Sequence, residues 1–405
     1  MKKNKRRIFA IIASSLIIIL ITISSVYFNT QENNVELKSS LKEYNAELQE
    51  NENMHLEEDA SGDKLPVPNG YVGSKVAGEN EIDTGYVIYE GEEEVTDENV
   101  EEAQKTRNQY VWIPVPDVST MYGIDENGKK WGKLYDFTTD SGDNIDPVTG
   151  AKPLNWTESD DIIKIISKNS YMEPDIIKNG GNTAYDMNSR LKNLEIGVET
   201  THEFLMQLEE EFNYMIESIE KYGGFYIGRY ETGDLTQEKA VVRKGNGDIA
   251  NQNCYEMYKR CKGLNNEKTN VETGIIWGNQ WDRTLMWLIE SGNKTKEEIC
   301  GDSSSWGNYK NATFEYVNSD GDITIKNSGT STRIPTGSTE YTKANNIYDL
   351  AGNVCDWTSS GKRESRGGSY DDIGSSKTVY SRSFSYPPNN YRIVRLSCNA
   401  IYKII

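Results

Sequence analysis

The feature of this 405-residue sequence that most constrains its fold is the stretch between Asn346 and Tyr370. It places Asp349 and Asp356 on either side of Gly352, so that two carboxylates and nearby backbone carbonyls can turn toward one point. Glycine adopts positive φ without steric cost, which lets the chain curl there. The residues of this predicted oxygen cluster are Asp349, Gly352, Val354 and Asp356.

An oxygen cluster of this kind indicates a hard cation. Calcium takes six to eight oxygen ligands in flexible geometry, whereas zinc and copper prefer histidine or cysteine. We therefore predict a structural calcium ion at these four residues. The alternative is a polar turn between two strands, in which both aspartates are simply solvated.

The same stretch resembles the signature of the formylglycine-generating enzyme family, the sulfatase-modifying factors. The resemblance is carried by N-I-Y-D-L-A-G-N-V-C-D-W-T at 346–358 and R-G-G-S-Y at 366–370. Upstream segments follow in the family's order, with Y-V-W-I-P at 110–114, G-F-Y-I-G-R-Y-E-T at 224–232 and G-I-I-W-G-N-Q-W-D at 274–282. The resemblance implies an α+β, C-type-lectin-like fold that is irregular and rich in loops. It also implies calcium at the oxygen cluster, because members that bind calcium use the matching positions.

The catalytic metal ligands of that family are not found in this sequence. The resemblance implies two copper-binding cysteines just after R-G-G-S-Y, but 370–391 contains no cysteine. Related iron enzymes on this fold use three histidines, and this chain has two, His55 and His202. We therefore expect no copper or iron and predict a non-catalytic member. The alternative is a displaced copper pair formed by Cys355 and Cys398.

The segment at 371–391 is rich in serine, tyrosine, asparagine and arginine. Such side chains supply rigid aromatic area and adaptable hydrogen bonds at binding surfaces. We therefore predict a surface that recognises a protein or a glycan, although some of its aromatic residues are expected in the core. The candidate ligand-binding residues are Tyr370, Tyr380, Arg382, Phe384, Tyr386 and Tyr391.

The N-terminus has the pattern of a membrane anchor. Residues 1–7 carry five basic side chains and form a cytoplasmic segment, and residues 8–28 are almost wholly apolar. An apolar helix of this length can cross the roughly 30 Å hydrocarbon core, and basic residues keep its N-terminal flank in the cytoplasm. We predict a single-pass protein of the cell membrane with its C-terminal domain outside. A cleaved signal peptide is the alternative.

The rest of the chain is predicted to form an acidic stalk at 29–64, an N-terminal extension at 65–107 and one sulfatase-modifying-factor-like domain at 108–405. Apolar residues recur at intervals of three and four from Phe204 onward, which predicts an amphipathic helix with Thr200 or Thr201 as its N-cap. Further helices are predicted near 253–262 and after the turn at 277–281. Short strands are predicted at 312–317 and 323–326, joined by an N-S-D-G turn.

The formal net charge of −19 argues against nucleic acid as a partner, since no basic patch offers phosphate contacts. We predict a membrane-anchored extracellular binding module on a sulfatase-modifying-factor, C-type-lectin-like scaffold. Its partners would be an extracellular protein or glycan, with the membrane held only through the N-terminal helix. One alternative is a metal-dependent oxidoreductase of the formylglycine-generating type. The other is a bacterial surface receptor whose C-terminal segment is diversified by a retroelement.

Overall fold

The computed structural model describes residues 48–139, 144–155, 195–234, 240–245, 254–265, 267–359, 364–384, 394–395 and 399–404. Within these ranges the protein is a mixed α+β structure with mostly antiparallel sheets and few helices. The basic segment at 1–7 and the predicted anchor at 8–28 lie outside the described residues. In the part of the chain that is described, no helix is both long enough and apolar enough to span a bilayer.

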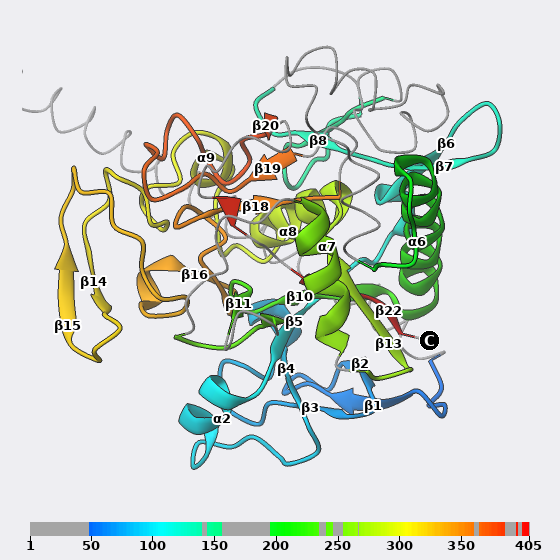
Figure 1. Ribbon diagram of the computed structural model, residues 1–405, viewed down its shortest axis with the longest axis horizontal. Coiled ribbons are helices and arrows are strands. Elements are labelled where there is room, and N and C mark those ends of the chain that lie inside the picture. Colours follow the sequence, from blue (N-terminus) through cyan, green and yellow to red (C-terminus); the bar gives the residue numbers. More distant parts are fainter. Residues whose placement is uncertain are drawn as a thin grey trace, which may run out of the picture.

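A six-stranded antiparallel sheet runs through the centre of the molecule, in the order β13-β22-β10-β5-β4-β3 (Figure 1). Its central strand β5 is buried at all six positions, which is typical of a strand covered on both faces. The predicted strands at 110–114 and 224–230 are neighbours in this sheet. Its strands are β3 (Tyr71–Gly73), β4 (Val87–Glu90), β5 (Gln109–Pro114), β10 (Gly224–Gly228), β13 (Val271–Ile275) and β22 (Asn399–Ile404).

The residues preceding β5 belong to the same folded unit. β1 (Met54–Glu58) pairs along its length with β2 (Lys64–Pro68), and Met54 is fully buried. β3 and β4 extend the central sheet from β5, so a domain boundary at 107–108 would cut through hydrogen-bonded strands. The stalk prediction is therefore wrong from Met54 onward. Its polar composition was misleading, because a short edge strand needs only one or two apolar side chains to join a core.

The longest helix, α6 (Thr201–Tyr222), begins where the sequence predicts. Thr200 Oγ1 accepts a hydrogen bond from the Glu203 amide (3.2 Å), and Glu203 Oε2 accepts one from the Thr200 amide (3.1 Å). This reciprocal pair satisfies two amides that the first helical turn leaves open. The helix ends at Gly223, whose φ of 76° is left-handed. Its buried residues, which face β10 and β22, include Phe212, Met215, Ile216 and Ile219.

The helix α8 (Gly278–Glu290) is buried from Gly278 to Leu288. It begins at Gly278, where Gln280 Oε1 accepts a hydrogen bond from the Trp277 amide (3.0 Å). One side of α8 contacts β5, and Trp281 Nε1 on it donates to the Val379 carbonyl (3.3 Å). The other helices are α2 (Val100–Thr106), α7 (Cys254–Lys262) and α9 (Lys296–Cys300), with 3-10 turns η1 (Ile82–Thr84), η2 (Val118–Thr120), η3 (Gly263–Asn265) and η4 (Glu340–Thr342).

The remaining strands form small sheets around this core. A four-stranded sheet has the order β20-β19-β18-β21, in which β18 and β21 are parallel. The predicted hairpin at 312–326 is present as β14 and β15. The bounds are β6 (Tyr122–Ile124), β7 (Lys130–Gly132), β8 (Tyr135–Asp136), β9 (Lys152–Pro153), β11 (Gly233–Asp234), β12 (Ala240–Val241), β14 (Phe314–Val317), β15 (Ile323–Lys326), β16 (Lys343–Ala344), β17 (Ile347–Tyr348), β18 (Cys355–Trp357), β19 (Glu364–Arg366), β20 (Ser383–Phe384) and β21 (Val394–Arg395).

A buried ion pair joins the N-terminal strands to the motif-rich stretch. Arg229 Nη2 lies 2.6 Å from Glu79 Oε1, and the two side chains are only 2% and 7% exposed. Burial alone would raise the pKa of Glu79, but the charge and hydrogen bond of Arg229 outweigh it and lower that pKa. The Arg229 carbonyl accepts a hydrogen bond from the Tyr348 amide (2.9 Å). Arg229 thus contacts two segments that are far apart in sequence, one at Glu79 and one at Tyr348.

We expect Arg229→Met to destabilise the fold strongly, because it leaves the Glu79 carboxylate buried without its counter-charge. The expected loss is about 3–5 kcal/mol in the free energy of unfolding, measured by urea denaturation of the purified protein. The control is Lys343→Met, which removes an exposed ion pair with Glu340 and should cost at most about 1 kcal/mol. Equal losses in the two variants would contradict a central role for Arg229.

Candidate functional site

The turn at Gly352 and Asn353 is fixed by the Asn353 side chain. Its Nδ2 donates to both carboxylate oxygens of Glu231, at 3.0 and 2.8 Å. Its Oδ1 accepts hydrogen bonds from the Ile334 amide (3.0 Å) and from Asn308 Nδ2 (2.9 Å). Asn353 is fully buried with a φ of 54°, a left-handed conformation that asparagine tolerates better than most residues. The turn is therefore a structural junction between two motif segments.

Gly352 cannot be replaced without moving the backbone beside it. Its φ is 75°, and a Cβ built on it would lie 2.4 Å from the Asn308 carbonyl oxygen. Its amide donates to the Gly367 carbonyl (2.7 Å), which brings the R-G-G-S-Y segment onto the turn. The glycine in the motif therefore serves close backbone approach as well as positive φ.

The two aspartates of the predicted oxygen cluster, called the acid pair below, are Asp349 and Asp356. Both are buried, so the alternative in which they are simply solvated is wrong. Asp349 Oδ2 accepts hydrogen bonds from Thr336 Oγ1 (3.0 Å) and the Gly337 amide (2.9 Å). Burial, and then the charge of Asp349, raise the pKa of Asp356 well above its ordinary value. The two carboxylates are thus close enough to oppose each other's ionisation.

The donor set around the acid pair is all oxygen. Val354 of the predicted cluster is buried and has no donor atom in its side chain, so it could contribute only its backbone carbonyl. Among the described residues, no group of three or more histidine, cysteine, aspartate or glutamate side chains is arranged to hold a metal ion. A cation at the acid pair would therefore need backbone carbonyls or water as further ligands. That donor set suits calcium or another hard cation.

A second buried group, called the ion-pair frame below, consists of Asp282, Arg366 and Arg382. Arg366 Nη2 bonds to Asp282 Oδ1, and Arg382 Nη2 lies 2.7 Å from Asp282 Oδ2. Asp282 and Arg366 are fully buried, whereas the Arg382 side chain is 17% exposed. Asp282 Oδ2 also accepts a hydrogen bond from the Tyr135 amide (2.8 Å). The frame anchors two C-terminal segments on α8.

Two of the predicted ligand-binding residues, Tyr380 and Arg382, contribute to packing. The Tyr380 ring contacts Phe137 edge-on, with the ring centroids 5.3 Å apart. The Arg382 guanidinium lies 5.4 Å from the centroid of the Tyr380 ring. Tyr380 Oη also bonds to Asp136 Oδ1 (3.4 Å). These contacts, with the ion pair to Asp282, show that Tyr380 and Arg382 mainly hold the C-terminal segment in place. Partners so distant in the chain gave no local signal in the sequence.

The other four predicted ligand-binding residues have different outcomes. Tyr370 is half-exposed, and its amide donates to the Asn353 carbonyl (2.9 Å). Phe384 ends β20, but its side chain lies outside the part that the structure describes. Tyr386 and Tyr391 also fall outside the described residues. Of the six, Tyr370, Tyr380 and Arg382 have described side chains, and all three are partly exposed.

An exposed loop follows Tyr370, at the start of the segment that the sequence predicts to be a binding surface. Ile373 in this loop is 47% exposed. The loop is fixed at its base, because the Lys310 amide donates to the Asp372 carbonyl (2.8 Å) and the Gly374 amide to Asn311 Oδ1 (3.1 Å). We call residues 370–376 the C-terminal loop. It is an accessible surface on a well-anchored base.

Cys355 lies next to Asp356 of the acid pair in the chain. Burial, and then the charges of Asp372 and Asp356, raise the pKa of Cys355 to about 12, so the sulfur is a thiol at neutral pH. Cys261, on α7, is a buried free thiol. Cys398 lies outside the described residues, so the displaced copper pair with Cys355 stays a prediction.

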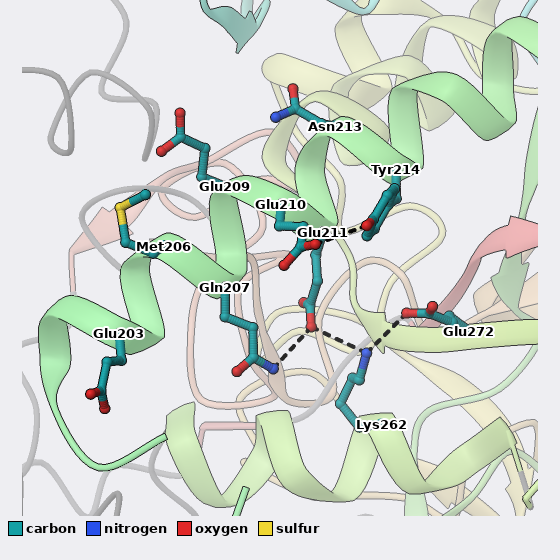
Figure 2. A pocket seen from close by; sticks show the side chains of 10 residues that line it. All are labelled: Glu203, Met206, Gln207, Glu209, Glu210, Glu211, Asn213, Tyr214, Lys262 and Glu272. Carbon is teal, nitrogen blue, oxygen red and sulfur yellow. Dashed lines mark hydrogen bonds and ion pairs between the residues drawn. The ribbon is translucent and has the colours of Figure 1, made fainter. Parts of the chain in front are cut away.

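A groove of about 1010 Å³ opens along the exposed side of α6, away from these groups (Figure 2). At its floor, Lys262 Nζ lies 3.1 Å from Glu211 Oε1 and 3.2 Å from Glu272 Oε2, which ties α7 to α6 and β13. No predicted site residue lines it. The lining residues are Glu203, Met206, Gln207, Glu209, Glu210, Glu211, Asn213, Tyr214, Lys262 and Glu272.

No protein-family model and no curated protein sequence matches this chain. The arguments for its function therefore come from the motifs and from the geometry described above.

We expect Asn353→Gly to destabilise the fold by about 2–3 kcal/mol, because it strips the buried Glu231 carboxylate of its amide donors. Glycine tolerates the left-handed φ, so this variant isolates the side-chain hydrogen bonds. Asn353→Ala should cost about 1 kcal/mol more, since alanine is strained at that φ. Thermal unfolding of both variants measures the difference. A glycine variant as stable as the wild type would show that the amide contributes little.

Proposed function

We propose that this protein is a membrane-anchored binding module of the bacterial cell surface that recognises an extracellular protein or glycan through its C-terminal loop. The observation that carries the proposal is the ion-pair frame of Asp282, Arg366 and Arg382. It fixes the strands on both sides of an exposed, polar loop to a buried helix. Loops presented on a rigid scaffold are the usual place for binding residues.

The fold assigned in this proposal is that of the sulfatase-modifying factors, with a C-type-lectin-like arrangement. Its support is that the motif segments, which are separated in sequence, meet in the structure. Glu231 of the segment at 224–232 bonds to Asn353 of the segment at 346–358. Arg366 of R-G-G-S-Y bonds to Asp282 of the segment at 274–282. The anchor rests on the sequence pattern at 1–28 alone.

A binding role is favoured over the oxidoreductase alternative by the state of Cys355. A copper-dependent enzyme needs a thiolate ligand, and the raised pKa of Cys355 opposes thiolate formation. The negative charges of Asp372 and Asp356 also disfavour a thiolate at Cys355, since both raise its pKa. The residues around Cys355 thus fit a structural thiol better than a reactive one.

The proposal includes a structural calcium ion at the acid pair of Asp349 and Asp356. Burial, and then repulsion from Asp349, raise the pKa of Asp356, and a divalent cation bound there would offset both. Because Gly352 of the same turn bonds to Gly367, an ion here would also brace the R-G-G-S-Y segment and the loop that follows it. Calcium supplies no chemistry in this role beyond charge and coordination.

We expect calcium to raise the melting temperature of the wild-type protein above its value in chelator. At a hundredfold excess of calcium over Kd, the free energy of unfolding should increase by about 2.7 kcal/mol. Asp356→Asn should abolish this response, because the amide carries no charge. In chelator the same variant should melt above the wild type at neutral pH. The pKa of Asp356 is raised in the folded state, so its ionisation costs stability as pH rises above the ordinary aspartate value.

The pH dependence supplies the control for that experiment. In chelator, wild-type stability should fall as pH rises from about 4, the region where an ordinary aspartate ionises, and Asp356→Asn should flatten the curve. A wild-type protein that responds to neither calcium nor chelator would rule out the ion. The acid pair would then hold a shared proton instead.

We expect Ile373→Asp to weaken ligand binding at least about tenfold, equivalent to about 1.4 kcal/mol, because a charge is placed in the centre of the C-terminal loop. The measurement is binding of the labelled protein to arrays of glycans and of secreted proteins. The matched control is Ile124→Asp on β6, where the side chain is 63% exposed. Equal loss in both variants, or no loss in either, would contradict recognition through this loop.

A further inference from the structure

The hairpin of β14 and β15 has two faces of opposite character. Its register pairs Val317 with Ile323 and Glu315 with Ile325, so these four side chains share one face. We call them the hairpin face. Their neighbours Phe314, Tyr316, Thr324 and Lys326 point to the other side. The hairpin stands at the edge of the molecule, on the left of the view in Figure 1.

The inner side of the hairpin accounts for its stability without the hairpin face. Phe314 stacks on Tyr341 with centroids 4.7 Å apart, in a small core with Ala312 and Ile334. Lys326 Nζ donates to the carbonyls of Tyr309 (2.5 Å) and Ala312 (2.9 Å). The hairpin is thus held to the body of the protein by its inner residues.

The hairpin face is apolar and exposed. Val317, Ile323 and Ile325 are 42%, 75% and 56% exposed. They make up three of the seven large hydrophobic residues that are exposed in the described part of the chain, although they come from a single short hairpin. Scattered exposed aliphatic residues are ordinary on a soluble protein, but a contiguous group marks a site of interaction.

The hairpin face is also preorganised. Asn318 Oδ1 accepts hydrogen bonds from the amides of Asp320 (3.0 Å) and Asp322 (2.9 Å), which fixes the turn. The other edge of β14 is braced too, since the Val317 amide donates to the Ser338 carbonyl (2.9 Å). A rigid surface loses little conformational entropy on binding.

Within the hairpin itself, the exposed charged residues are all negative. Glu315 lies on it, and Asp320 and Asp322 are exposed in the adjoining turn. The one basic residue of the hairpin, Lys326, is 2% exposed and lies on the inner side. A partner must therefore cover aliphatic side chains and bring positive charge to their border.

We propose that the hairpin face is a docking site for a basic amphipathic polypeptide segment, one with a stripe of aliphatic side chains flanked by lysine or arginine. Aliphatic groups offer a glycan neither an aromatic face nor a hydrogen bond. The negative border repels an anionic lipid surface and a second copy of this chain, whose net charge is −19. This site is separate from the C-terminal loop and does not rest on the function proposed there.

The test uses the full-length protein immobilised on a biosensor and a synthetic helix of leucine and lysine with its leucines on one face. Ile323→Thr combined with Ile325→Thr should weaken binding at least about tenfold, because threonine keeps the strand preference but removes the apolar surface. Glu315→Gln with Asp320→Asn and Asp322→Asn should weaken it and flatten its salt dependence. Ile124→Thr, another exposed isoleucine on a β-hairpin, should change nothing.

Two further controls separate docking at the hairpin face from non-specific attraction and from binding at the C-terminal loop. A scrambled peptide of the same composition forms no leucine stripe, so its binding should be weak and equal for the wild type and the isoleucine variant. Ile373→Asp should leave binding of the leucine-lysine helix intact, whatever its effect on the C-terminal loop. Unchanged melting temperatures confirm that the variants are folded, and Ile325→Thr alone serves if the double variant is not.

Three outcomes would overturn the proposal. The first is equal affinity of the leucine-lysine helix for the wild type and the isoleucine variant. The second is a dimer, detected by light scattering, that the isoleucine substitutions dissociate, which would assign the face to a second copy. The third is binding to vesicles of phosphatidylcholine and phosphatidylglycerol that the same substitutions abolish, which would assign it to lipid.

Discussion

The structure depends on polar side chains buried just beyond the end of β10. Arg229 pairs with Glu79 from the N-terminal strands, and Glu231, two residues later, accepts the amide of Asn353. Each of these groups would be costly to bury alone, and each is satisfied by a partner from a distant segment. The polar pairs therefore specify how the irregular, loop-rich segments assemble. If apolar side chains stood at these positions instead, the loops could pack in several arrangements, because apolar contacts have no preferred direction.

Local patterns in the sequence predicted the regular elements well. Helix α6 could be read from its apolar spacing and from Thr200 and Glu203, because the interactions that start and shape a helix lie within one or two turns. The hairpin of β14 and β15 was predictable for the same reason, since alternating residues flank an N-S-D-G turn. The tight turn at Gly352 was predictable because few residues other than glycine adopt its φ.

Properties that depend on distant partners could not be read in this way. Arg382 was predicted to bind a ligand because its segment is polar, but its ion pair with Asp282, 100 residues earlier, could not be foreseen. The segment from Met54 was taken for a stalk because its own apolar residues are few, and its burial comes from strands β2 to β4. The acid pair was identified from the spacing of its residues in the sequence. Its burial, which raises the pKa of Asp356, follows from the packing of the whole loop region.

The acid pair and the ion-pair frame are connected through the backbone. Asp356 on β18 lies opposite Arg366 on β19 in the backbone register of the two strands. The Arg366 side chain in turn forms an ion pair with Asp282. A Cβ built on the next residue, Gly367, would lie 3.4 Å from Asp356 Oδ2, so the R-G-G-S-Y segment runs directly over the carboxylate. The charge at Asp356 therefore acts on the strand that leads into the C-terminal loop. A cation or a proton that neutralises this charge would therefore remove an electrostatic cost beside the strand that leads into the C-terminal loop.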